Sequence, residues 1–259
     1  MLLASRGQIG RNGLPTRKYW LKSGIWQTAV RGAALICGLL TILAPKASAR
    51  PSSEVNAAKQ SPASCEILYA GFVGAMETHN HKGSGVVQLR DALRGPEYAD
   101  VCSESFIPLS WESCRNWILS RFPRHSGLLT QAESAAAPRI ILVGHSTGGW
   151  AMLKVARDLR NKGIPVALTV QLDSVGITDR TVPSNVKASA IFHARDILMF
   201  LTTKNIRAED PLHTKLIANV VVKNASHLSI TRDPRVRNLV LSTVLALRED
   251  RATLAEAKQ

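Results

Sequence analysis

Hydrophobic positions along the chain fall into short runs separated by helix-length segments. Six of these runs have the length and composition of buried parallel strands. The predicted strands are Cys65–Ala70, Val101–Leu109, Arg139–Gly144, Pro165–Leu172, Val186–Ala194 and Ile217–Lys223. The predicted helices between and after them are Ser84–Leu93, Trp111–Ser120, Thr147–Asn161 and Arg235–Arg248.

Strands that alternate with helices predict an α/β fold, a three-layer α/β/α sandwich with a mostly parallel sheet and helices on both faces. The length of 259 residues and a hydrophobic content of 45% are sufficient for one sizeable core. We therefore expect a single compact domain over residues 65–250, without a large cap domain, and a C-terminal tail over residues 251–259.

Residues 1–49 have the order of an export signal. Basic residues come first, the apolar run Gly32–Ala44 follows, and Ala47 and Ala49 form an A-x-A cleavage site. The apolar run is shorter than the roughly 20 residues of a spanning helix. We expect cleavage after Ala49 and a periplasmic or secreted protein; the alternative is an uncleaved N-terminal membrane tether. Residues 50–64 are polar and rich in Ser, Ala and Pro, which predicts a flexible linker.

Net charge changes this picture little. The chain carries 33 basic and 19 acidic residues, a net charge of +14, but seven of the basic residues lie in residues 1–49, which contain no acidic residue. The remainder has 26 basic against 19 acidic residues, a net charge of +7. No arginine-aromatic stripe or nucleic-acid reading module is present, so we expect no nucleic-acid partner.

Three cysteines remain after the predicted cleavage. An oxidising compartment permits disulfides, and Cys102 and Cys114 are close enough in sequence to pair, which leaves Cys65 single. Spacing does not fix connectivity, and three buried thiols are the alternative. No Cys/His group has the spacing of a zinc site, so we expect no metal.

The pattern Gly144-His145-Ser146-Thr147-Gly148 joins a predicted strand to a predicted helix. This G-x-S-x-G sequence is typical of a nucleophile elbow, a sharp turn that exposes a serine hydroxyl at a helix N-terminus. Glycines two residues before and after the serine allow strand and helix to approach closely. Ser146 is therefore the candidate nucleophile.

A serine nucleophile needs a general base, and the base needs an acid that orients it. His227 follows the last predicted strand and precedes the last predicted helix, so it belongs at the carboxyl edge of the sheet. His145, beside the serine, is expected to point away from it. His79 and His81 lie in the loop after the first strand, where they and Met76 are candidates for substrate contact.

The segments "LVGHSTGG", "QLDSVG", "VPSNVKASAIFHARD" and "NASHLSI" resemble bacterial lipase-like or esterase-like members of the α/β-hydrolase superfamily. The resemblance covers about residues 65–248. It implies a catalytic triad of Ser146, His227 and an aspartate. Asp173 follows the strand after the elbow helix and Asp196 follows the next strand; we favour Asp173 and keep Asp196 as the alternative acid.

Two backbone amides are candidates for the oxyanion hole. Thr147 follows the serine at the start of the helix, and Phe72 lies in the loop after the first strand, with Val73 as the next choice. The expected activity is hydrolysis of carboxylic esters, with a small-molecule or lipid ester as substrate and no cofactor. Alternatives are a thioesterase or acyltransferase on the same fold, or a non-catalytic envelope binding protein.

Overall fold

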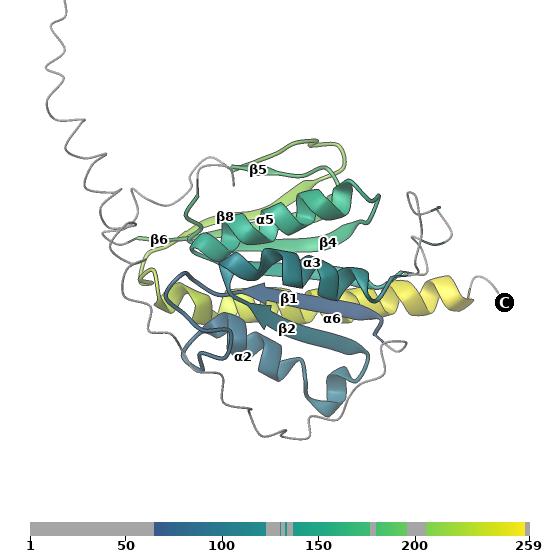
Figure 1. The fold of residues 1–259 in the computed structure, drawn as a ribbon, viewed down its shortest axis with the longest axis horizontal. Coiled ribbons are helices and arrows are strands. Elements are labelled where there is room, and N and C mark those ends of the chain that lie inside the picture. Colours follow the sequence, from purple (N-terminus) through teal and green to yellow (C-terminus); the bar gives the residue numbers. More distant parts are fainter. Residues whose placement is uncertain are drawn as a thin grey trace, which may run out of the picture. The chain divides into compact units, whose positions relative to one another are not determined.

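A six-stranded sheet forms the centre of the protein (Figure 1). The computed structural model describes residues 65–122, 130, 133, 137–176, 180–195 and 206–256. Its strands follow the order β2-β1-β3-β4-β6-β8, and every neighbouring pair is parallel. They are β1 (Ile67–Phe72), β2 (Val101–Phe106), β3 (Arg139–His145), β4 (Val166–Leu172), β6 (Val186–Ala194) and β8 (Lys215–Val222).

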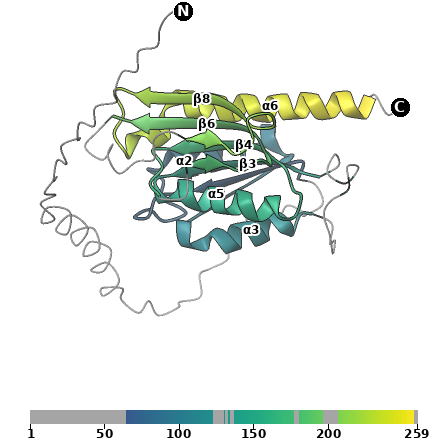
Figure 2. The same ribbon diagram turned by 90° about the horizontal axis from the view of Figure 1, so that it is seen from above.

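Helices cover both faces of the sheet, which confirms the predicted α/β fold of three layers. Helices α3 (Trp111–Leu119) and α5 (Thr147–Arg160) lie on one face (Figure 1), and α6 (Pro234–Glu256) lies on the other (Figure 2). Helix α2 (Gly85–Ala92) shares the face of α6. The shorter elements are η2 (Pro96–Tyr98), η3 (Pro108–Ser110), η5 (Ser229–Arg232), and the strand pair β5 (Thr181–Val182) and β7 (Arg207–Ala208).

Side-chain alternation along β1 divides the core in two. Leu68, Ala70 and Phe72 pack in the cluster that includes α3 and α5, whereas Ile67 and Tyr69 pack in the cluster that includes α2 and α6. All residues of β1 are buried, because both faces of the sheet are covered. This double coverage is why the strand sequences are continuous apolar runs and lack polar alternation.

Element boundaries differ from the prediction where local chemistry intervenes. Strand β2 ends at Phe106, because Pro108 has no amide hydrogen for the ladder and begins η3. Helix α6 continues to Glu256, through most of the range predicted as a tail. Its buried positions Val240, Val244 and Leu247 keep one face in the core up to that range. No helix in the described part of the chain is both long and apolar enough to cross a membrane.

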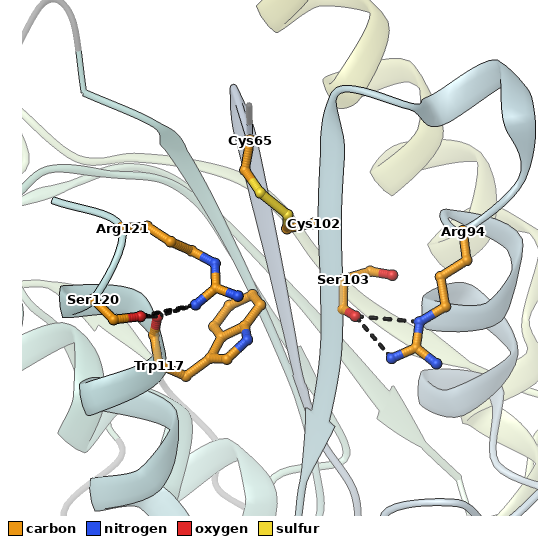
Figure 3. The surroundings of a disulfide bond; sticks show 7 residues. All are labelled: Cys65, Arg94, Cys102, Ser103, Trp117, Ser120 and Arg121. Atoms are coloured by element: carbon orange, nitrogen blue, oxygen red, sulfur yellow. Dashed lines mark hydrogen bonds between the residues drawn. A yellow bond between two sulfur atoms is a disulfide. The ribbon is translucent and has the colours of Figure 1, made fainter. Parts of the chain in front are cut away.

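One disulfide joins Cys65 to Cys102 (Figure 3), so the predicted pairing of Cys102 with Cys114 is wrong. Cys65 lies two residues before β1, and Cys102 is the second residue of β2, the strand that pairs with β1. The two Cα atoms are 5.5 Å apart, a distance that a disulfide spans. Cys114 lies in α3 and is a free, fully buried thiol. Burial raises the pKa of the Cys114 thiol well above its usual value, because the charged thiolate is poorly solvated there.

Removal of this disulfide should destabilise the domain. The bond closes a loop with a sequence separation of 37, for which we expect a loss of about 2–4 kcal/mol of unfolding free energy in the double variant Cys65→Ser/Cys102→Ser. Urea denaturation of both proteins, with and without reductant, measures this difference. Reductant should lower the midpoint of the wild type and leave the double variant unchanged; equal midpoints for the two oxidised proteins contradict the prediction.

Candidate active site

The candidate serine lies at the point where the strand order changes direction. From β1 the chain continues to β2 on one side and then to β3 on the other. In open α/β sheets, ligands bind outside the carboxyl ends of the strands at such a switch point. Ser146 directly follows β3, at the carboxyl end of that strand, and precedes α5. Topology therefore places its hydroxyl where a substrate is expected.

The backbone of Ser146 has the strained conformation expected of a nucleophile elbow. Its φ of 54° and ψ of −126° lie in a region that non-glycine residues rarely adopt. Hydrogen bonds on both sides maintain it: the Ser146 amide donates to the Leu172 carbonyl at 3.0 Å, and the Ser146 carbonyl accepts from the amides of Gly149 and Val175 at 3.0 Å. The turn thus depends on β4 and its following loop as well as on α5.

Glycine is required at both ends of the G-x-S-x-G pattern for steric reasons. A Cβ on Gly144 would lie 2.5 Å from the Gly148 carbonyl oxygen. A Cβ on Gly148 would lie 2.6 Å from the carbonyl oxygens of Phe72 and Val73. The first contact confirms the close approach of strand and helix expected from the sequence, and the second shows that the start of α5 also lies directly against the backbone at the end of β1.

The three predicted triad residues are hydrogen-bonded in series. Nε2 of His227 lies 3.0 Å from Oγ of Ser146, and Nδ1 of His227 lies 2.6 Å from Oδ2 of Asp173. These residues are 81 and 54 positions apart from His227 along the chain, so the contacts result from the fold and not from local sequence. The side chain of His227 is 13% exposed and that of Asp173 is fully buried.

Asp173 is held in place by the sheet. Its amide donates to the Phe192 carbonyl at 2.7 Å, and its Oδ1 accepts from the Ala194 amide at 3.0 Å, so both carboxylate oxygens have a partner. Its φ of 45° is another left-handed conformation of a non-glycine residue. Asp173, the favoured candidate acid, contacts His227; the alternative, Asp196, lies outside the described residues.

The predicted oxyanion donors are backbone amides at the end of β1 and at the start of α5. Thr147 is the first residue of α5, where amides lack partners within the helix. The Val73 amide donates to the Phe106 carbonyl of β2 at 3.1 Å. Because successive amides along a strand point to opposite neighbours, the Phe72 amide points towards β3, the strand that precedes Ser146. Phe72 is paired with Gly144 of β3, so this direction places its amide in the sheet ladder and does not distinguish it from Val73. Phe72 stays the predicted second donor.

Among the remaining candidates, Met76, His79 and His81 lie in the exposed loop after β1, with Met76 91% exposed. Residues of α2 and β2 hold this loop in place, because the His79 carbonyl accepts hydrogen bonds from Arg90 at 3.0 Å and from the Ser105 hydroxyl at 2.5 Å. Neither hydrogen bond involves the triad.

Sequence reasoning missed Glu77, which follows Met76 in the same loop. Its Oε2 lies 3.1 Å from Nδ1 of His145 and accepts a hydrogen bond from the Gly74 amide at 2.7 Å. Burial alone would raise the pKa of Glu77, but the hydrogen bonds from His145 and Gly74 outweigh it and lower the pKa to about 2. The available signal was that Glu77 is the one acidic residue between Gly71 and Gly85.

A surface cavity of about 680 Å³ lies between the end of β8 and the start of α6, beside the His227 loop. Exposed polar residues line much of it, including Lys223, Asn224, Arg232 and Arg235. Ser146 and Asp173 are not in its lining, so the hydrogen-bonded series and not this cavity defines the candidate site. Among the described residues, no group of three or more His, Cys, Asp or Glu side chains is arranged to hold a metal ion.

Glu77 should make stability depend on pH in a defined window. Since its folded pKa of about 2 lies below the ordinary value of 4.5, its carboxylate stabilises the fold above about pH 4.5. That contribution, about 3 kcal/mol, is lost as the pH falls from about 4.5 to about 2. Urea denaturation across this range should show a weaker pH dependence in Glu77→Gln than in the wild type. The exposed Glu112 of α3 supplies the control Glu112→Gln, which should retain the wild-type dependence.

Comparison with known proteins identifies no relative of the chain. No model of a known protein family matches it, and a search of curated proteins also finds no match. The site is therefore interpreted from its own residues.

Proposed function

We propose that the protein is a serine hydrolase that cleaves carboxylic esters. The observation that carries the proposal is the hydrogen-bonded series from Ser146 through His227 to Asp173, with distances of 3.0 and 2.6 Å. A hydroxyl in contact with an imidazole, whose second nitrogen contacts a buried carboxylate, is the arrangement that activates serine as a nucleophile.

In the proposed reaction, Ser146 Oγ attacks the carbonyl carbon of the ester while His227 Nε2 takes the serine proton. The resulting oxyanion accepts hydrogen bonds from the amides of Thr147 and Phe72, and the N-terminus of α5 favours its negative charge. His227 then gives the proton to the leaving alcohol, and an acyl group remains on Ser146. Water attacks this acyl-enzyme with His227 again as base, which releases the acid and restores the serine.

Asp173 has an electrostatic and an orienting role in this scheme. Its Oδ2 accepts a hydrogen bond from Nδ1 of His227, so the proton stays on Nδ1 and Nε2 remains free to act as base. When His227 becomes an imidazolium, the carboxylate stabilises the charge. The Ala194 amide on the other carboxylate oxygen keeps Asp173 in the orientation that this requires.

We also propose that the protein is exported and cleaved after Ala49. The Cys65–Cys102 disulfide supports export, because such bonds form and persist in oxidising compartments. An intact Met1 on protein recovered from outside the cytoplasm contradicts cleavage.

Covalent labelling tests the proposed function. The purified protein should react with a fluorophosphonate probe and hydrolyse short p-nitrophenyl esters, because the probe and the ester both require an activated serine. Ser146→Ala should lose the label and the turnover while it keeps the wild-type unfolding midpoint. Failure of the folded wild type to label at Ser146 would falsify the hydrolase assignment.

Replacement of Asp173 should cause a large loss of turnover that replacement of Asp196 does not cause. Asp173→Asn removes control over the His227 tautomer, which costs on the order of ten-thousand-fold in turnover in serine proteases. We expect a loss of that order in kcat on a p-nitrophenyl ester, with Asp196→Asn as the matched control and a much smaller loss there. Comparable losses in the two variants, or a larger one in Asp196→Asn, overturn the role of Asp173.

A further inference from the structure

A second imidazole, that of His145, lies beside the ring of the proposed base, His227. His145 is the last residue of β3, directly before Ser146, and only 1% of it is exposed. Its Nδ1 lies 3.1 Å from Oε2 of Glu77, and its Nε2 lies 2.8 Å from the main-chain carbonyl oxygen of His227. The rings of His145 and His227 pack against each other with centroids 4.8 Å apart.

Both partners of the His145 ring are hydrogen-bond acceptors. A carbonyl oxygen only accepts, and the Glu77 carboxyl, with a pKa of about 2, is ionised at neutral pH and also only accepts. A neutral imidazole has one N–H, so it would direct a lone pair at an oxygen in one of the two contacts. Both contacts are satisfied together only when both ring nitrogens carry hydrogen, that is, when His145 is an imidazolium.

The His145 ring also connects three segments of the site. Glu77 belongs to the loop after β1, which begins beside the proposed oxyanion donor Phe72. His145 belongs to the elbow strand, and the carbonyl that it contacts belongs to the loop of the proposed base, His227. The loop after β1 lies close to the His145 ring, since a Cβ on Gly74 would lie 3.1 Å from Nδ1 of His145.

We propose that His145 is a positioning residue: a buried imidazolium, anchored by Glu77, that fixes the main chain of His227 and thereby the contact between His227 and Ser146. This inference rests on the proposed function for its catalytic consequence. The charged groups around the ring balance in pairs, with Glu77 beside His145 and Asp173 beside His227. Without Glu77, the His145 charge would oppose the positive charge that His227 gains during the reaction.

A pair of amide variants separates the two hydrogen bonds of His145. In His145→Gln the amide nitrogen takes the place of Nε2 and can still donate to the His227 carbonyl. In His145→Asn it takes the place of Nδ1 and can donate only to Glu77. We expect kcat on p-nitrophenyl acetate to fall roughly ten- to hundredfold in His145→Asn with KM unchanged, and by much less in His145→Gln.

Unfolding midpoints of the two variants in urea control for general damage to the core. Equal losses of kcat in the two folded variants indicate a role in packing alone and overturn the proposal. A larger loss in His145→Gln than in His145→Asn also overturns it, because the contact with His227 would then not be the one that matters.

Nitrogen NMR tests the charge on the wild type without any dependence on turnover. With ¹⁵N-labelled histidine, and His145→Gln to assign the resonances, both ring nitrogens of His145 should be protonated at pH 7.5. An unprotonated nitrogen on His145 overturns the inference even if the protein is an active esterase. If Ser146 fails to label but both nitrogens are protonated, the hydrolase assignment and the catalytic consequence fail, and the charged ring stands.

Discussion

The site depends on one backbone conformation, the left-handed turn at Ser146. Such a conformation costs about 1–3 kcal/mol in a non-glycine residue and persists only where the surroundings determine it. Here the amide and carbonyl of Ser146 are hydrogen-bonded to residues of β4, its following loop and α5, and the flanking glycines permit contacts that any side chain would block. The buried parallel sheet supplies the rigidity that keeps the serine in this conformation.

Charge is arranged around that turn in two imidazole–carboxylate pairs, His227 with Asp173 and His145 with Glu77. A buried charge is costly unless it is paired and hydrogen-bonded, so each carboxylate also accepts a backbone amide, from Ala194 or Gly74. The two pairs divide the work in the proposed mechanism. The pair of His227 and Asp173 exchanges a proton with the substrate, and the pair of His145 and Glu77 holds the loops of the site in position.

Much of this arrangement could be predicted from local sequence. Six apolar runs predicted the six long strands. The inner strands are largely buried, and the edge strand β8 keeps an apolar run although most of its residues are exposed or half-buried. The glycine spacing around Ser146 predicted the elbow because sterics require it. His227 was identifiable by its position after the last strand. The paired short strands β5 and β7 were not predicted, since two residues carry no periodicity.

Features that depend on tertiary contacts could not be predicted from local sequence. Asp173 and Asp196 both follow strands, so position after a strand does not choose between them, and the role of Asp173 rests on its contact with His227. The disulfide joins Cys65 to Cys102 through the pairing of β1 with β2, although Cys114 is nearer in sequence to Cys102. Glu77 was missed because its partner, His145, was expected only to point away from Ser146.

The position of the disulfide has a mechanical consequence. Cys65 is joined covalently to β2, an edge strand of the sheet, immediately before the chain enters β1. Tension applied to the chain ahead of Cys65, as on a protein tethered by its N-terminal end, is therefore shared with β2 through a covalent bond before it reaches the hydrogen bonds of β1. The strand that leads to the proposed oxyanion donor is in this way shielded from being peeled off the sheet.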